Sequence, residues 1–418
     1  MHAAELSSRV IKNWQWCTVL LLLVLAPINS KLAGACWLAL CLLGAWSFKR
    51  CSTQESSAEF SAAKCWVFAC LSALVLRAVP QFYWGDNWGE RHAEFRLLLG
   101  AFGLLGLASC ARLTINQVRW LGNALILATW SGFGWMVVFG SALAPTNQIP
   151  WGASMALLVC VALAMTLSAS TQRLPIRLFY ASGVMAGTGA VLLSQARGSY
   201  GIVFWVGGVL LCNYAKSGIK WLALIARALI VVTVIGLFFQ LFPQLISVPI
   251  QRIEQASVEI SAINSAKTIE ADTSVGIRLF LWDKAMHEIP VNLWFGLGYT
   301  KSAEEIQRWG VEANAPALKA IGHIHNNYLD AMFDSGLFGL GSFLSFIVGL
   351  FYMSLRLIKS RPYASLGIAG ILFMHVTSSL TNVNFAHNYY PTMLSVAVSV
   401  CLLLFMKTSG SDDVTSRN

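Results

Sequence analysis

The sequence contains few charged residues, and this scarcity excludes an ordinary soluble domain. Only 11% of its 418 residues are Asp, Glu, Lys or Arg, whereas 56% are hydrophobic. A soluble domain is usually about 25% charged. Apolar runs of about 20 residues, the length that spans a bilayer, recur along most of the chain. The composition therefore predicts a polytopic membrane protein.

Acidic residues are absent from a long internal stretch. No Asp or Glu occurs between Phe95 and Arg252, so this part of the chain offers no pair of carboxylates in the middle of the membrane. The one long polar segment contains no cysteine. The cysteines elsewhere show neither a disulfide framework nor a metal-binding spacing.

Twelve helices are predicted to cross the membrane. The first has basic residues before an apolar run, as a signal peptide does, but its removal would leave an odd number of spans, so it is predicted to be retained. The predicted spans cover residues 14–30, 33–48, 64–83, 94–111, 118–141, 152–170, 177–195, 199–214, 219–242, 327–355, 363–380 and 390–407.

Basic residues predict the orientation of these spans. With the N-terminus in the cytoplasm, more than half of the 29 lysines and arginines fall in cytoplasmic segments, as the positive-inside rule favours. Both termini are therefore expected in the cytoplasm. This topology explains most of the net charge of +10, and no nucleic-acid partner is expected.

The long polar segment divides the chain. The predicted parts are membrane helices 1–9 at 1–242, an outer loop with helices at 243–326, membrane helices 10–12 at 327–407 and a cytoplasmic tail at 408–418. Within the loop, a helix is predicted that Thr273 or Ser274 caps and Pro290 ends. Arg278 shares the apolar face of that helix with Trp282.

Two histidines precede the tenth span, in the stretch HIHNNYLDAMFDSGLFGL that begins at His323. Asn326 or His325 is expected to open the helix. A helical wheel groups His325 with Tyr328, Leu329, Met332 and Gly336. It groups His323 with Asn327, Asp330 and Asp334. The wheel thus predicts that His325 faces the bundle and that His323 faces a polar surface.

The candidate site combines His325 with Arg278 and with Arg197, which lies in a very short outer turn. The planar forks of two arginines match the oxygens of a diphosphate, and nearby cations keep a histidine unprotonated. A neutral His325 is suited to act as a general base on a sugar hydroxyl. With the diphosphate as leaving group, the anomeric configuration inverts and no metal or other cofactor is needed.

Each of these residues also has a structural explanation that spacing alone does not exclude. An interfacial arginine such as Arg197 often extends to lipid headgroups. Arg278 fits an ion pair within the loop, and His325 fits a helix cap.

Three ordered motifs resemble the O-antigen ligase and polymerase superfamily over about residues 180–345. The family's Arg-Gly turn falls on Arg197 and Gly198 of SQARG. Its His-Asn-x-x-Leu motif falls on His325, Asn326 and Leu329. Its loop motif, in GIRLFLWDKAMHEIPVNLWFGLGYT, falls on Arg278, Trp282, Pro290, Gly296 and Gly298.

The resemblance implies a metal-independent glycosyltransferase of the bacterial inner membrane, with an all-α, GT-C-like fold and an active site that faces the periplasm. Such an enzyme transfers a glycan from undecaprenyl diphosphate to the lipid A–core oligosaccharide, among membrane lipids. His325 is then the catalytic base, and Arg197 and Arg278 bind the diphosphate. The expected supporting residues are Tyr200, Trp282, Asn326, Tyr328 and His387.

Three other functions stay open. A polymerase of the same superfamily would join carrier-linked repeat units, although a ligase is favoured. A lipid-glycan transporter should show broken helices and ionisable residues near the middle of the membrane. A metal-using transferase would draw on Asp86 and Glu90 in YWGDNWGERH.

Overall fold

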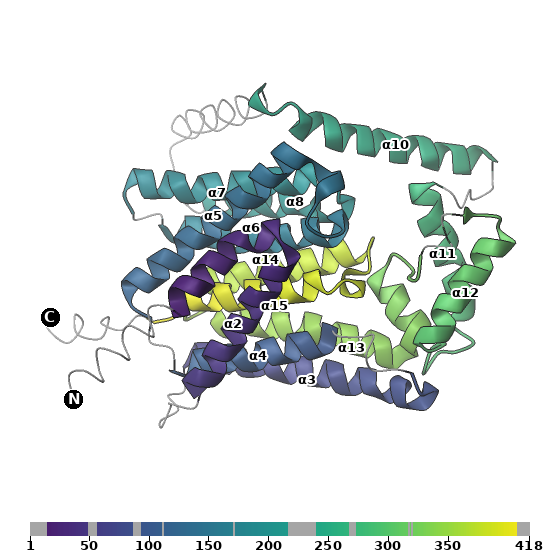
Figure 1. Ribbon diagram of the computed structural model, residues 1–418, viewed down its shortest axis with the longest axis horizontal. Helices are drawn as coiled ribbons and strands as arrows, with labels where there is room; N and C mark the ends of the chain where they lie inside the picture. The colour runs from purple at the N-terminus through teal and green to yellow at the C-terminus, as the bar shows by residue number, and fades with distance from the viewer. Residues whose placement is uncertain are drawn as a thin grey trace, which may run out of the picture.

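The computed structural model describes residues 15–48, 57–86, 93–110, 113–169, 172–215, 240–266, 273–316, 318 and 321–407. Within these ranges the regular structure is entirely helical (Figure 1). The helices in chain order are an apolar helix at Gln15–Ile28, α2 (Ser30–Phe48), α3 (Ala58–Trp84), α4 (Ala93–Cys110), α5 (Ile115–Phe139), α6 (Gln148–Ser168), α7 (Leu174–Leu193), α8 (Gly201–Ala215), α10 (Gln244–Ala266), α11 (Ser274–Glu288), α12 (Tyr299–Glu312), α13 (Asn327–Leu357), α14 (Pro362–Ser379) and α15 (Tyr389–Leu404).

The helices form a membrane bundle, as predicted. In the described ranges, seven are long and apolar enough to cross a membrane: α2, α3, α5, α6, α7, α13 and the segment Arg197–Ala215 that contains α8. Gln15–Ile28 and α15 are shorter apolar helices. The chain is therefore an all-α polytopic membrane protein.

The predicted count of twelve spans stays a prediction. The predicted span at 219–242, apart from its C-terminal end, lies outside the described residues, as does the tail at 408–418. Each of the other predicted spans overlaps a described helix.

The centre of the bundle is formed by α6 and α15. Nearly every residue of these two helices is buried, as expected for helices that are apolar on all sides and surrounded by other helices. Helix α15 packs against α4 and α6, and α6 also packs against α7 and α14. The outer helices present their large apolar side chains, such as Phe68 of α3 and Phe204 of α8, to the surroundings.

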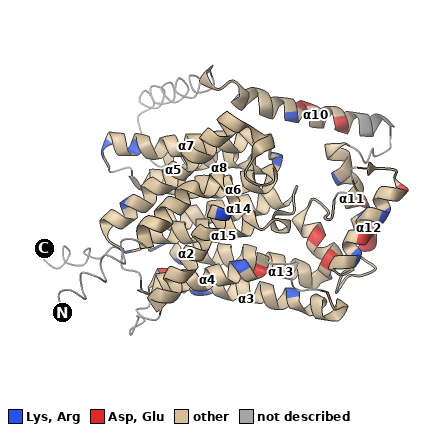
Figure 2. Ribbon diagram, viewed as in Figure 1, with Lys and Arg blue, Asp and Glu red and all other residues tan. Residues whose placement is uncertain are grey.

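The long polar segment contains three helices that lie beside the bundle rather than within it. In Figure 1, α10 runs along one side, and α11 and α12 lie across one end. Most acidic residues of the described chain lie on α10–α12 and on the start of α13 (Figure 2). Leu281 and Ala285 of α11 and Ile306 and Trp309 of α12 form a small core with Phe333 of α13.

The helix predicted around Arg278 is confirmed as α11. The Thr273 hydroxyl accepts a hydrogen bond of 3.0 Å from the Gly276 amide, which is the N-cap geometry. The helix ends at Glu288, just before Pro290. Local sequence signals therefore set both ends of the element that carries Arg278.

Helix α13 is interrupted at Gly336, where φ is 61° and ψ is −151°. The Leu337 amide donates to the carbonyl of Leu293 (2.8 Å) instead of continuing the helix, and Leu297 donates to Phe333 (3.0 Å). The helical wheel placed Gly336 on the same face as His325; in the structure it breaks the helix against the loop that follows α11. The first turns of α13 are thereby joined to the loop.

Replacing Gly336 with alanine should destabilise the protein. A Cβ there would lie 2.3 Å from the Trp294 backbone, and this backbone region is accessible essentially only to glycine, at a cost of about 1–3 kcal/mol for other residues. We expect the melting temperature in detergent to fall by several degrees. Gly207→Ala in α8 is the matched control, because a Cβ there meets nothing within 4 Å. Equal melting temperatures for the two variants would contradict this account of the interruption.

Candidate active site

Three arginines line one cavity at the end of the bundle. The cavity has a volume of about 280 Å³ and lies between the turn after α7, α10, α11 and the end of α14. Its lining includes Arg197 and Arg278, the two arginines predicted from the sequence, and also Arg252 of α10. No Asp or Glu belongs to its lining among the described residues. We call this space the arginine cavity.

The position of Arg197 follows from a tight turn. Gln195 has a left-handed backbone, with φ at 61°, and Arg197 opens the short 3-10 helix Arg197–Ser199 that leads into α8. A Cβ on the next residue, Gly198, would lie 2.3 Å from the Thr381 hydroxyl. The turn is therefore pressed against the end of α14, and Arg197 is confined to the rim of the bundle.

The other two arginines are held by hydrogen bonds. The guanidinium of Arg278 donates to the hydroxyl of Ser274 (3.0 Å) and weakly to the carbonyl of Thr381 (3.4 Å). The guanidinium of Arg252 donates to the side chain of Gln195 (2.9 Å). None of these acceptors is charged, so the positive charges of both groups remain available to an anion.

Electrostatics at the arginine cavity favour an anionic ligand. Burial and the charge of Arg197 lower the pKa of the Arg278 guanidinium, and Glu259 offsets part of this effect. Like charges held together in a partly buried site repel each other until a counter-charge binds. The planar guanidinium groups suit the oxygens of a phosphate or diphosphate.

His325 lies before α13 and not within it. Asn326 is the N-cap, and its side chain accepts hydrogen bonds from the amides of Tyr328 (3.0 Å) and Leu329 (3.2 Å). Of the two predicted helix starts, Asn326 and His325, the structure therefore has the one at Asn326. His325 has a left-handed backbone, with φ at 54°. The helical-wheel argument for His325 was therefore wrong, because a wheel applies only to helical residues.

The surroundings of His325 hold its ring in the neutral form. Burial lowers the pKa of His325 to about 2, with further lowering from His323, Arg278 and His387. Its Nδ1 is buried and has no hydrogen-bond partner in the described part of the chain. His325 is thus an uncharged imidazole near the arginine cavity, although it does not belong to the lining of that cavity.

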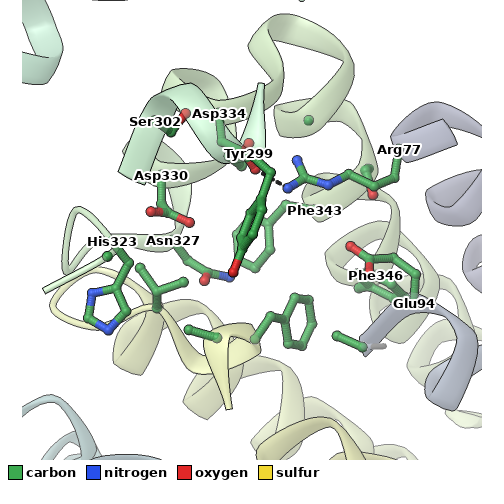
Figure 3. A pocket seen from close by; sticks show the side chains of 18 of the residues that line it. Arg77, Glu94, Tyr299, Ser302, His323, Asn327, Asp330, Asp334, Phe343 and Phe346 are labelled. Carbon is green, nitrogen blue, oxygen red and sulfur yellow. Dashed lines mark hydrogen bonds and ion pairs between the residues drawn. The ribbon is translucent and has the colours of Figure 1, made fainter. Parts of the chain in front are cut away.

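His323 stands beside His325 but lines a different cavity. The two rings meet edge to face with centroids 4.4 Å apart. The second cavity also contains Asn327, Asp330 and Asp334 (Figure 3). His323 therefore does share a polar surface with these residues, although it too lies before α13 and the helical wheel does not explain its position.

The predicted supporting residues differ in what they contact. Trp282 lines the arginine cavity and donates its indole N–H to the carbonyl of Ile324 (3.0 Å), next to His325. Tyr328 donates to the carbonyl of Val376 in α14 (3.3 Å). His387 lies with its ring 6.3 Å from that of His323, and burial lowers its pKa. Tyr200 donates to the carbonyl of Leu192 (3.3 Å) and lines neither cavity.

Two groups of residues escaped the sequence prediction. Arg252 of α10 was not among the predicted site residues. Arg77 of α3 was not among them either, and it forms a buried ion pair with Asp334 of α13. The sequence did contain a signal for the pair of Arg77 and Asp334, since ionisable residues within predicted spans usually have a partner or a function.

Asp86, one of the two residues of the alternative metal-using site, connects two helices. Its carboxylate accepts hydrogen bonds from the Tyr299 amide (2.7 Å) and the Thr300 hydroxyl (3.3 Å), which joins the end of α3 to the start of α12. Glu90 lies outside the described residues. In the described ranges, no three His, Cys, Asp or Glu side chains form a group that could hold a metal ion.

Comparison with known families agrees with the ordered motifs. Residues 181–344 match the family model described as O-antigen ligase, nearly the range over which the motifs resemble that superfamily. The match includes Arg197, Arg278 and His325. No curated protein matches the chain significantly. The match over residues 181–344 supports a relationship of the chain to the O-antigen ligase/polymerase family.

Proposed function

We propose that this protein is an O-antigen ligase. It transfers a glycan from undecaprenyl diphosphate to the lipid A–core oligosaccharide at the periplasmic face of the bacterial inner membrane, with the segment at 243–326 in the periplasm. The observation that carries the proposal is the neutral His325 beside a cavity with Arg197, Arg252 and Arg278 and no lining carboxylate. This pairing suits an anionic leaving group and a nucleophile that must lose a proton.

The proposed reaction is a single displacement. A hydroxyl oxygen of the acceptor attacks the anomeric carbon of the donor and forms the new glycosidic bond. The bond from that carbon to the diphosphate oxygen breaks, and its electron pair stays on the diphosphate. The hydroxyl proton passes to His325, which acts as the general base. Because attack and departure occur on opposite sides of the carbon, the configuration inverts.

The arginines stabilise the charge that develops on the leaving group. Groups already oriented towards the departing oxygens stabilise the transition state without reorganising during the reaction. Arg278 is held by Ser274 and Thr381, and Arg252 by Gln195, so both are oriented before the donor binds. This arrangement requires no metal ion, and we expect transfer to persist in EDTA.

A polymerase is the second candidate, because the matched family covers both activities. The acceptor would then be another carrier-linked repeat unit, with the same diphosphate site and base. Deletion of the gene distinguishes the two. Loss of a ligase should leave long glycan on its carrier beside uncapped core, as resolved by gel electrophoresis of lipopolysaccharide. Core capped with single repeat units would identify a polymerase and contradict the ligase proposal.

A further inference from the structure

The cavity that contains His323 differs in chemistry from the arginine cavity. It has a volume of about 290 Å³ and is enclosed by α3, α4, α12, α13 and the segment after α14. Figure 3 shows His323, Asn327 and Asp330 on one side of it, with Arg77 and Glu94 on the other. We call this space the acidic cavity, because it holds Glu94, Asp330 and Asp334 and, as its only lining guanidinium among the described residues, Arg77.

The lining of the acidic cavity suits phosphate groups less well than the lining of the arginine cavity does. The one guanidinium, that of Arg77, is already engaged by Asp334 in the buried ion pair. Glu94 and Asp330 face the same space and leave an excess of carboxylates. A phosphate would be repelled there, whereas a ligand that donates hydrogen bonds would be attracted.

One polar side chain of the acidic cavity, Asn327, has no hydrogen-bond partner within the described residues although most of it is buried. Asn327 is only 4% exposed and lines the cavity, and no hydrogen bond to its side-chain amide is found within the described residues. Its amide atoms are not among the fully buried partnerless atoms of the described chain, so they are accessible from the space of the cavity. Asn327 thus provides an unused donor and acceptor at the wall of the cavity.

The other walls of the acidic cavity suit a sugar ring. Carboxylate and amide oxygens accept hydrogen bonds from hydroxyls, and the rings of Tyr299, Phe343 and Phe346 supply apolar surface. The volume is at the lower end of the range for small-molecule sites, which favours one monosaccharide unit over an oligosaccharide. His323 joins this cavity to His325, since the two rings are in contact.

We propose that the acidic cavity binds the terminal, unphosphorylated sugar of the acceptor and presents its hydroxyl to His325. This inference rests on the proposed transferase function. The two cavities then bind substrate groups of different charge. The diphosphate of the donor binds in the arginine cavity, and the neutral sugar of the acceptor binds in the acidic cavity. The histidine segment 323–325 lies between them.

The test measures steady-state transfer by the full-length protein in detergent. The donor is undecaprenyl-diphosphate-linked O antigen, and the acceptor is lipid A–core purified from a strain that lacks O antigen. In Asn327→Leu the nearly isosteric side chain removes hydrogen bonding without breaking a bond within the protein. We expect the acceptor KM to rise at least tenfold, with the donor KM within twofold of wild type and the melting temperature unchanged or higher.

Thr188→Val in α7 is the matched control, because the Thr188 hydroxyl is also buried and without a partner in the described chain but lies in neither cavity. It should leave both KM values unchanged. Asp330→Asn, which removes a charge from the acidic cavity, provides a second variant if Asn327→Leu does not fold, and it should also raise the acceptor KM.

Two results would overturn the inference: an unchanged acceptor KM in the folded variants, or a rise in the donor KM in its place. Failure of the proposed function is distinguishable, because the wild-type protein would then transfer no glycan to the acceptor at all.

Discussion

Replacing His325 with alanine is expected to lower the rate of transfer by about 10²- to 10⁴-fold, the usual contribution of a positioned general base. Donor binding should persist, because His325 does not line the arginine cavity. The measurement is single-turnover transfer by purified protein at matched concentration, together with donor affinity measured separately. Loss of donor affinity, with turnover of bound donor preserved, would make His325 a ligand of the diphosphate and not a base.

His323→Ala is the control for this experiment. The two rings are in contact, so a general effect of removing an imidazole would appear in both variants. With saturating acceptor, His323→Ala should turn over at close to the wild-type rate, because His323 faces the acidic cavity. An inactive His323 variant beside an active His325 variant would reverse the assignment.

The pH dependence of kcat/KM provides an independent test of the protonation state of His325. Its pKa is far below the usual value, so the ring in the free enzyme stays unprotonated when the pH falls from 8 to 5.5. The value of kcat/KM reports ionisations of the free enzyme. We therefore expect no loss of kcat/KM near pH 6.5 that depends on His325.

Replacing Arg278 with alanine should weaken transfer by about one to two decades. A hydrogen bond to a charged group contributes on the order of 1.5–3 kcal/mol, which corresponds to that change in rate when the contact forms in the transition state. Arg197→Ala should act similarly. Lysine at either position should restore only part of the activity, because it lacks the planar fork of donors.

Arg308→Ala is the matched control for the arginine variants. Arg308 lies on α12, is exposed and pairs with Glu305 and Glu312 of the same helix. Its removal lowers the charge of the segment by the same amount but should leave transfer unchanged. If Arg197→Ala and Arg278→Ala both insert normally and transfer at the wild-type rate, the diphosphate binds elsewhere.

The sequence was sufficient to predict the all-α membrane bundle and the helix that carries Arg278, because local features determine these helices. Apolar runs of membrane-spanning length mark the helices of the bundle, and Thr273 and Asn326 cap α11 and α13 through their own side chains. The grouping of Arg197 with Arg278 in one cavity was also anticipated, from the ordered motifs. Each helix signal and each motif is contained in a short window of sequence, and the order of the motifs along the chain identified the two arginines as a group.

The remainder of the site depends on contacts between distant segments. Arg77 and Asp334 are 257 positions apart, and Arg252 reaches Gln195 from another helix. The backbone of His325 is left-handed beside Ile324, whose carbonyl accepts from Trp282 and whose amide donates to Asp330. No periodicity near His325 reports these contacts, and for this reason the helical wheel failed there.

The most direct test of the account is reconstituted transfer by the purified full-length protein in EDTA, with the anomeric configuration of the new linkage determined by NMR. The donor is undecaprenyl-diphosphate-linked glycan, and the acceptor is lipid A–core oligosaccharide. The account predicts a glycosylated acceptor whose new linkage has the configuration opposite to that of the donor. A linkage of retained configuration, or transfer that EDTA abolishes and a divalent metal restores, would contradict it.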